Sequence, residues 1–342
     1  MRVLTGFLLL ASLPLQAREL GESEQLAWFN YHLAVAEAPG DVRSDQLMIK
    51  MLGLTESLPL PPGGEDAKPS EPMRAYRARA QVVAAELEAR VAAARDGDPF
   101  LLGGDLGCWP KAADMSTCDS RRAKLEPFAA SNAYHGVVLM AYAWAREDAD
   151  AFLRVARLAA AADTYDSLPA FALQSLMDRY QKVPLPATPD MDALTRSHTA
   201  EVMALAMSAA IAIPPLQHFS QPCRESEGEL RAHCLAIARK MMSGQNLIEA
   251  GIGLSVVRAL GSAEDIALAD ARQRETQWLQ EKAVPLMAAS EKFAVAGIDE
   301  FFESYGRDGE IEAMRALLKA HGIASLPPAD WTKASNRPAA NP

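Results

Sequence analysis

Hydrophobic residues along the chain recur mostly at spacings of three and four, which is the period of an amphipathic helix. One such stripe consists of Tyr76, Ala80, Val83, Leu87 and Val91. It predicts a helix that begins near Pro72, because proline is well tolerated in the first helical turn. No segment alternates apolar and polar residues as a half-buried strand does. The pattern therefore predicts an all-α protein.

The same pattern divides the rest of the chain into predicted helices. They are expected near 23–38, 121–129, 132–146, 148–162, 167–182, 190–213, 245–260, 263–289, 290–304 and 308–320. A further short helix is expected to begin at Ser44, and the helix that carries Cys234 is expected to end at Met242. Connections between 121 and 182 are short, so neighbouring helices there should be antiparallel. We expect an N-terminal helical region at 18–96 with a flexible loop at 55–72, an α-hairpin domain at 97–325, and a disordered tail at 326–342.

The first 17 residues have the composition of an export signal. Arg2 supplies the basic start, Phe7–Leu13 is apolar, and Leu15–Ala17 ends in a small residue. This apolar run is much shorter than the roughly 20 residues of a membrane-spanning helix. We expect cleavage after Ala17, no membrane span, and a periplasmic or secreted protein.

Composition changes this picture in two ways. Alanine is abundant and aromatic residues make up only 6% of the chain, which favours helices. The formal net charge is −10, and no basic tract is present in the sequence. Nucleic acid and anionic lipid are therefore not expected as partners.

Four cysteines form two closely spaced pairs, Cys108 with Cys118 and Cys223 with Cys234. Four cysteines permit three connectivities, and in an exported protein the two local disulfides are favoured. In one continuous helix, the Cα atoms of residues 223 and 234 would lie about 16 Å apart, whereas a disulfide requires roughly 4.4–6.8 Å. Cys223 is thus expected in a loop that folds back on the Cys234 helix. A metal site of Cys223, His233 and Cys234 is the disfavoured alternative, because adjacent residues on a helix point about 100° apart.

One segment carries a family resemblance on the residues Asn132-Ala133-Tyr134, Ala141, Ala143, Arg146-Glu147-Asp148-Ala149, Phe152, Ala156 and Ala159. It resembles tetratricopeptide-like (TPR-like) helical repeat proteins of the bacterial periplasm, in which small residues lie where antiparallel helices cross. The resemblance covers one repeat, lacks the later proline and does not recur at a period of about 34 residues. It implies antiparallel α-hairpins, stacked in a TPR-like superhelical array or an irregular bundle and stapled by two disulfides. It also implies a surface that binds peptides or proteins.

Catalytic and cofactor motifs are absent from the sequence: it contains no HExxH, phosphate loop or G-x-S-x-G elbow. Tyr134 and His135 are candidates for a binding groove. Met191, Met203 and Met207 are compatible with copper, although core packing explains them better. No metal or other cofactor is expected.

Glu303-Ser304 matches the glutamate that opens a Glu-Ser motif in some periplasmic enzymes that cleave peptidoglycan. Burial beside Phe301 and Phe302 would raise the pKa of Glu303 and suit it to general acid catalysis. The sugar-binding segments of such enzymes are not visible in this sequence.

The leading hypothesis is a non-catalytic exported helical protein that binds a periplasmic or cell-envelope protein or peptide. A peptidoglycan-acting enzyme that uses Glu303 is the alternative. A secreted factor that acts on a host cannot be separated from the first class by sequence, and the sequence leaves the oligomeric state open.

Overall fold

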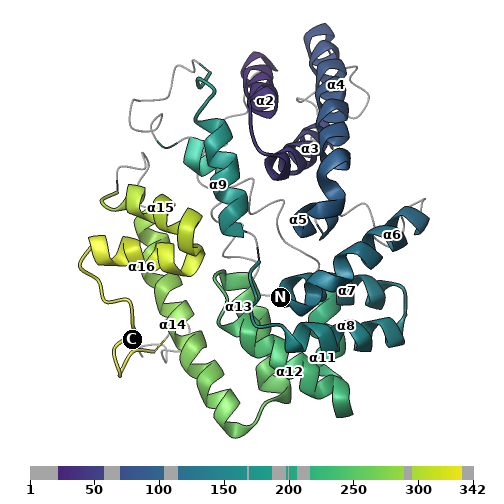
Figure 1. Cartoon of the computed structure of the whole chain (residues 1–342). Coiled ribbons are helices and arrows are strands. Elements are labelled where there is room, and N and C mark those ends of the chain that lie inside the picture. Colours follow the sequence, from purple (N-terminus) through teal and green to yellow (C-terminus); the bar gives the residue numbers. More distant parts are fainter. Residues whose placement is uncertain are drawn as a thin grey trace. The chain divides into compact units, whose positions relative to one another are not determined.

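The computed structural model describes residues 22–57, 70–103, 115–167, 169–186, 198, 200–205, 216–288 and 295–332. All regular elements within these ranges are helices (Figure 1), and the one β-type contact among them is an isolated bridge between Asn132 and Thr164. The prediction of an all-α protein is confirmed. The predicted signal at 1–17 lies outside the described residues.

The chain divides into two compact units, each of which combines segments that are distant in sequence. Unit 1 comprises 1–107, 117–124 and 171–213, and unit 2 comprises 108–116, 125–170 and 214–342. The helices that lie wholly or mostly in unit 1 are α2 (Glu22–Glu37), α3 (Val42–Ser57), α4 (Glu71–Ala94), η1 (Arg95–Gly97), α5 (Pro99–Gly103), α6 (Met115–Leu125) and α9 (Pro169–Tyr180). Those of unit 2 are η3 (Glu126–Ala130), α7 (Ala133–Ala145), α8 (Ala149–Ala161), α11 (Gln217–Arg224), α12 (Gly228–Met242), α13 (Leu247–Leu260), α14 (Ala263–Ala288), α15 (Ile298–Asp308) and α16 (Glu310–Ala320).

Helix α4 shows how the periodic pattern produces the core of unit 1. The hydroxyl of Ser70 accepts a hydrogen bond from the Met73 amide at 3.3 Å and caps the helix just before Pro72. Every residue of the predicted stripe is at most 5% exposed. This face packs against α2 and α3. The predicted helix and its buried face are confirmed.

A buried arginine is one of the residues through which helix α9 joins unit 1. The Arg179 guanidinium donates hydrogen bonds to the Ala36 carbonyl of α2 at 2.9 Å and to the Ser44 hydroxyl of α3 at 2.7 Å. It also pairs with the buried carboxylate of Asp45. The sequence grouped 167–182 with the C-terminal helices, whereas these contacts attach α9 to the N-terminal ones.

In unit 2, α7 and α8 form the predicted antiparallel hairpin. The helices cross so closely that a Cβ atom added to Gly136 would lie 2.4 Å from the Cβ atom of Ala159. The chain reverses at Glu147, whose φ of 57° is the left-handed conformation that commonly ends a helix. The hairpin is confirmed, while a superhelical array of the TPR-like type stays a prediction.

The remaining helices of unit 2 pack in succession. Helix α8 contacts α12, α12 contacts α13, α13 contacts α14, and α14 contacts α16, which pairs with α15. The ammonium group of Lys240 in α12 donates to the Ala160 carbonyl at the end of α8, at 2.6 Å. A cation at this position also complements the negative end of the helix dipole.

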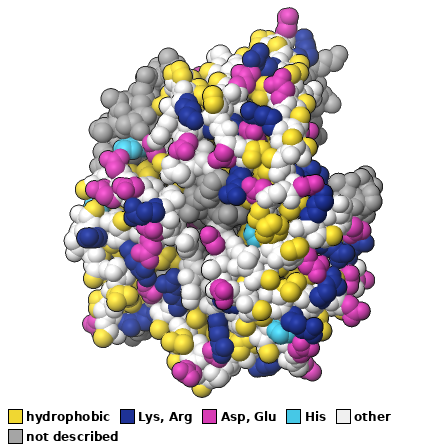
Figure 2. All heavy atoms as spheres, in the orientation of Figure 1, with side chains coloured by type: hydrophobic (Ala, Val, Ile, Leu, Met, Phe, Trp, Pro, Cys, Tyr) yellow, Lys and Arg dark blue, Asp and Glu magenta, His cyan; other side chains and the backbone are white. Residues whose placement is uncertain are grey.

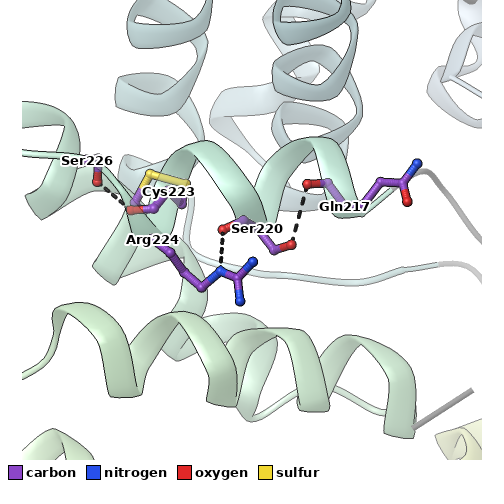
Figure 3. The surroundings of a disulfide bond; sticks show 6 residues. Gln217, Ser220, Cys223, Arg224 and Ser226 are labelled. Carbon is purple, nitrogen blue, oxygen red and sulfur yellow. Dashed lines mark hydrogen bonds between the residues drawn. A yellow bond between two sulfur atoms is a disulfide. The ribbon is translucent and has the colours of Figure 1, made fainter. Parts of the chain in front are cut away.

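The Cys223–Cys234 disulfide joins two helices (Figure 3), with the Cα atoms 5.5 Å apart. Cys223 lies in the last turn of α11 and Cys234 lies in α12, so the expectation of a loop at Cys223 is wrong. The chain can fold back because α11 ends at Arg224, and the Ser226 hydroxyl then bonds to the Cys223 carbonyl at 2.6 Å. Cys108 lies outside the described residues, so its pairing with Cys118 stays a prediction.

Two element boundaries differ from the sequence pattern. Helix α15 begins at Ile298 rather than near 290, because Gly297 has a φ of 82° and interrupts the helix. The predicted tail is held on α14 over its described part, where Arg274 donates to the carbonyls of Ala329 at 2.8 Å and Trp331 at 3.2 Å. Within the predicted loop at 55–72, residues 58–69 lie outside the described part of the chain.

Candidate functional site: a buried glutamate pair

Glu303, the candidate general acid, lies on the outer face of α15. Its side chain is 75% exposed and pairs with Arg307 at 3.2 Å, one helical turn away. Phe301 and Phe302 are buried instead of lying around the carboxylate, at 2% and 4% exposure. The apolar pocket that the general-acid hypothesis places around Glu303 is therefore not formed by these two residues.

Tyr134 and His135, the groove candidates, lie near the start of α7. His135 is 5% exposed and contacts Phe128 and Tyr134 edge to face, with ring centroids 6.4 Å and 5.6 Å apart. Tyr134 also contacts Tyr165 edge to face at 6.2 Å. Tyr134 is half-buried as a residue, yet burial and the charge of Glu249 both raise the pKa of its hydroxyl. The influence on this hydroxyl identifies Glu249 as a nearby acidic residue that the sequence did not suggest.

Glu249 belongs to the first turn of α13. The Asn246 side-chain oxygen caps the helix by accepting a hydrogen bond from the Glu249 backbone amide at 2.8 Å. The Glu249 carboxyl group in turn accepts hydrogen bonds from the Asn246 amide group and the Ser167 hydroxyl. The Glu249 residue is only 2% exposed. These bonds tie the segment before α9 to the N-terminus of α13.

Glu310 lies at the first position of α16 and is also 2% exposed. Its carboxyl group accepts a hydrogen bond from the Leu247 amide at 2.8 Å, which satisfies one of the unpaired donors at the start of α13. The Ile311 amide donates to the Gln245 carbonyl at 3.0 Å. Two helix N-termini and their two glutamates therefore meet at one buried position.

Gly309 permits this close approach. Its φ of 88° is a conformation that residues with side chains rarely adopt. A Cβ atom at this position would also lie 2.6 Å from the Cβ atom of Gln245. Glycine is thus required both by the backbone angle and by the neighbouring chain.

The two carboxyl groups hold protons more tightly than ordinary glutamates. Burial raises the pKa of Glu249 to about 7, although the hydrogen bonds from Ser167 and Asn246 act in the opposite direction. Burial raises the pKa of Glu310 to about 7, and the charge of Glu249 adds to this rise. Helix dipoles favour negative charge at these positions, but desolvation outweighs them.

Aromatic hydroxyls complete the surroundings of the pair. Burial raises the pKa of both Tyr165 and Tyr305 well above the ordinary range, and the charge of Glu249 acts in the same direction on both. The charge of Glu310 also raises the pKa of Tyr305. The pair is thus enclosed by neutral donors and by tyrosines. Both glutamates are only 2% exposed, so the described residues around them shield the carboxyl groups from solvent.

One sequence signal could have revealed this site. Asn246 and Glu249 have the spacing of a capping box, in which the residue three positions after the cap is acidic. Glu249 also stands within the otherwise apolar run of α13. Glu310 gives no comparable signal, because its partner Leu247 is distant in sequence.

The structure also describes some of the residues of the two metal sites considered from the sequence. Because Cys223 and Cys234 form a disulfide, they do not act with His233 as thiolate ligands. His233 instead contacts Glu229 at 3.1 Å. Among the described residues, no group of three or more His, Cys, Asp or Glu side chains could hold a metal ion. Of the three methionines considered for copper, Met191 and Met207 lie outside the described residues.

The surface carries mixed charge. On the face drawn in Figure 2, basic and acidic side chains of the described residues are interspersed. No helix in the described part of the chain has the length and apolarity to span a bilayer. Comparisons with protein-family models, curated proteins and solved structures find no match to this chain.

Proposed function

We propose that this chain is a non-catalytic exported helical protein that binds a peptide or protein segment through the turn end of the α7–α8 hairpin. The observation that carries the proposal is Trp144, which is 40% exposed on a helix with a firmly packed opposite face. A large aromatic side chain held on a rigid element is typical of residues that dominate binding energies.

The neighbours of Trp144 support this assignment. Its ring contacts Phe152 edge to face, with centroids 6.2 Å apart, which fixes its orientation. Arg146 lies over the Tyr142 ring at 5.6 Å and donates to its hydroxyl at 3.0 Å. Tryptophan, tyrosine and arginine are the residue types most enriched at interface hot spots.

Charge indicates what kind of segment would bind. The turn carries Glu147 and Asp150, both exposed, and the whole chain is acidic with a net charge of −10. We therefore propose a partner segment that combines an apolar side chain for Trp144 with basic residues. Opposite charges would accelerate encounter and set the orientation of binding.

The finer parts of the hypothesis belong to the same proposal. Export to the periplasm or beyond rests on the sequence of 1–17 and fits the Cys223–Cys234 disulfide, since disulfides persist in oxidising compartments. TPR-like stacking of further hairpins rests on the α7–α8 pair and the contact of α8 with α12.

A photo-crosslinking residue at position 149 of the full chain, which is exposed in the first turn of α8 and leaves Trp144 in place, tests the proposal in envelope extract. The matched control carries the same residue at Leu268, which is 57% exposed on α14 of the same unit. We expect a discrete adduct from position 149 and none from position 268. For the partner identified, Trp144→Ala should weaken binding at least about tenfold. Equal labelling from both positions, or undiminished binding by the variant, would overturn the assignment.

A further inference from the structure

We propose that Glu249 and Glu310 form a proton-operated latch, which holds the α15–α16 hairpin on the N-terminus of α13 while protonated and releases it on deprotonation. The latch does not depend on the proposed partner binding. The latch consists of two buried carboxyl groups, one on α13 and one on α16. The two helices are far apart in sequence and are joined by the hydrogen bond from the Leu247 amide to Glu310.

Among the described residues, no cation is recorded beside the pair. The neighbours of Glu249 are Asn246, which caps α13, Tyr134 of α7, and the segment Tyr165, Asp166 and Ser167. The neighbours of Glu310 are Tyr305 of α15 and Glu249 itself. None of these described neighbours is positively charged, and Asp166 adds negative charge. Ionisation of both glutamates would therefore place two like charges in a dry site, an arrangement that proteins avoid.

The α15–α16 hairpin makes few helix contacts outside itself. Its main helix contacts are those between its own two helices and the contact of α16 with α14. Helix α13 instead packs against α11, α12 and α14. The bonds from Leu247 to Glu310 and from Ile311 to Gln245 hold the start of α16 against α13, so charge repulsion acts where this docking is made.

The sign of the pH dependence follows from the direction of the shifts. Each folded-state pKa lies near 7, above the ordinary value of 4.5. The stabilisation is therefore complete under acidic conditions and is lost as the pH rises through 7. If the opened state has ordinary pKa values, its population rises about tenfold per carboxyl group between pH 6 and 8, and about 100-fold for the pair.

Hydrogen exchange of the full chain measures this opening. Peptides that cover 298–320 should lose about 100-fold protection between pH 6 and 8 after correction for intrinsic exchange. Glu310→Gln keeps an oxygen that can accept from Leu247 but cannot ionise, and should reduce the change to about tenfold. Glu249→Gln combined with it should abolish the change. The matched control is Glu303→Gln, which removes a carboxylate that is 75% exposed from the same hairpin and should behave as the unmodified chain.

Protection that does not vary with pH, or that varies equally in the glutamine variants, would overturn the latch. If those variants fail to fold, infrared spectroscopy of the unmodified chain decides. A carbonyl stretch of protonated carboxylic acid that disappears between pH 6 and 8 would support the proposal. Absence of that band at pH 6 would refute it.

Discussion

The close crossing of α7 and α8 makes an unusually sharp prediction about one methyl group. An alanine in place of Gly136 would put its Cβ atom 2.4 Å from the Cβ atom of Ala159 and 3.3 Å from its Cα atom. Both contacts involve backbone or the first side-chain carbon, so neither can be relieved by a rotamer change. The helices must separate, which typically costs about 1–3 kcal/mol in a packed core.

Intrinsic helix propensity acts in the opposite direction. Alanine is better than glycine in a helix interior by about 1 kcal/mol. The net expectation for Gly136→Ala is thus a loss of up to about 2 kcal/mol, which is the packing penalty less the propensity gain. The free energy of unfolding, obtained from urea titration followed by circular dichroism, measures this loss.

The chain supplies a matched control in the same unit. Gly251 lies within α13, and a Cβ atom added there meets nothing within 4 Å. Gly251→Ala should therefore stabilise by about 1 kcal/mol, because only the propensity term remains. The same substitution in two helices of one unit is expected to have opposite signs.

Ala159→Gly provides the rescue. Removing its Cβ atom leaves space for a methyl group at position 136, so Gly136→Ala in that background should lose its penalty. The double-mutant cycle should give a coupling free energy on the order of 2 kcal/mol. Additive effects, or stabilisation by Gly136→Ala alone, would show that the helices do not cross at this point.

Two further predictions concern stability. Replacing both Cys223 and Cys234 by serine should reduce the free energy of unfolding by about 3 kcal/mol, because the disulfide closes a loop with a sequence separation of 11. In reductant the variant and the unmodified chain should be equally stable, and a variant as stable as the oxidised chain would contradict this. Arg179→Leu should lower the free energy of unfolding by about 3–5 kcal/mol, because it leaves the buried Asp45 with the partly exposed Arg90, at 2.8 Å, as its one remaining ionic partner among the described residues. The control is Arg79→Leu, which breaks the exposed pair with Glu37 in the same unit and should change the free energy of unfolding by less than about 1 kcal/mol. Thermal unfolding measures both variants, and equal effects of the two would refute the buried pairing.

Much of the fold could be predicted from the local periodicity of hydrophobic residues. The stripe on α4 and the α7–α8 hairpin both follow from residues that are close in sequence, because a helix repeats its buried face every three to four residues. The pairing of Cys223 with Cys234 could be predicted from their spacing for a similar reason. The sequence did not reveal that Cys223 lies in a helix, since α11 is short and contains Pro222.

The sequence by itself thus determined the all-α class, most of the helices and the buried face of α4. Tertiary structure alone decided that Arg179 belongs with α3, that Glu303 faces solvent, and that Glu249 and Glu310 share one buried site. The physical reason is that helical periodicity is a short-range property, whereas desolvation and pairing of charges depend on groups brought together across the chain. A glutamate reads the same in sequence whether water or a second glutamate surrounds it.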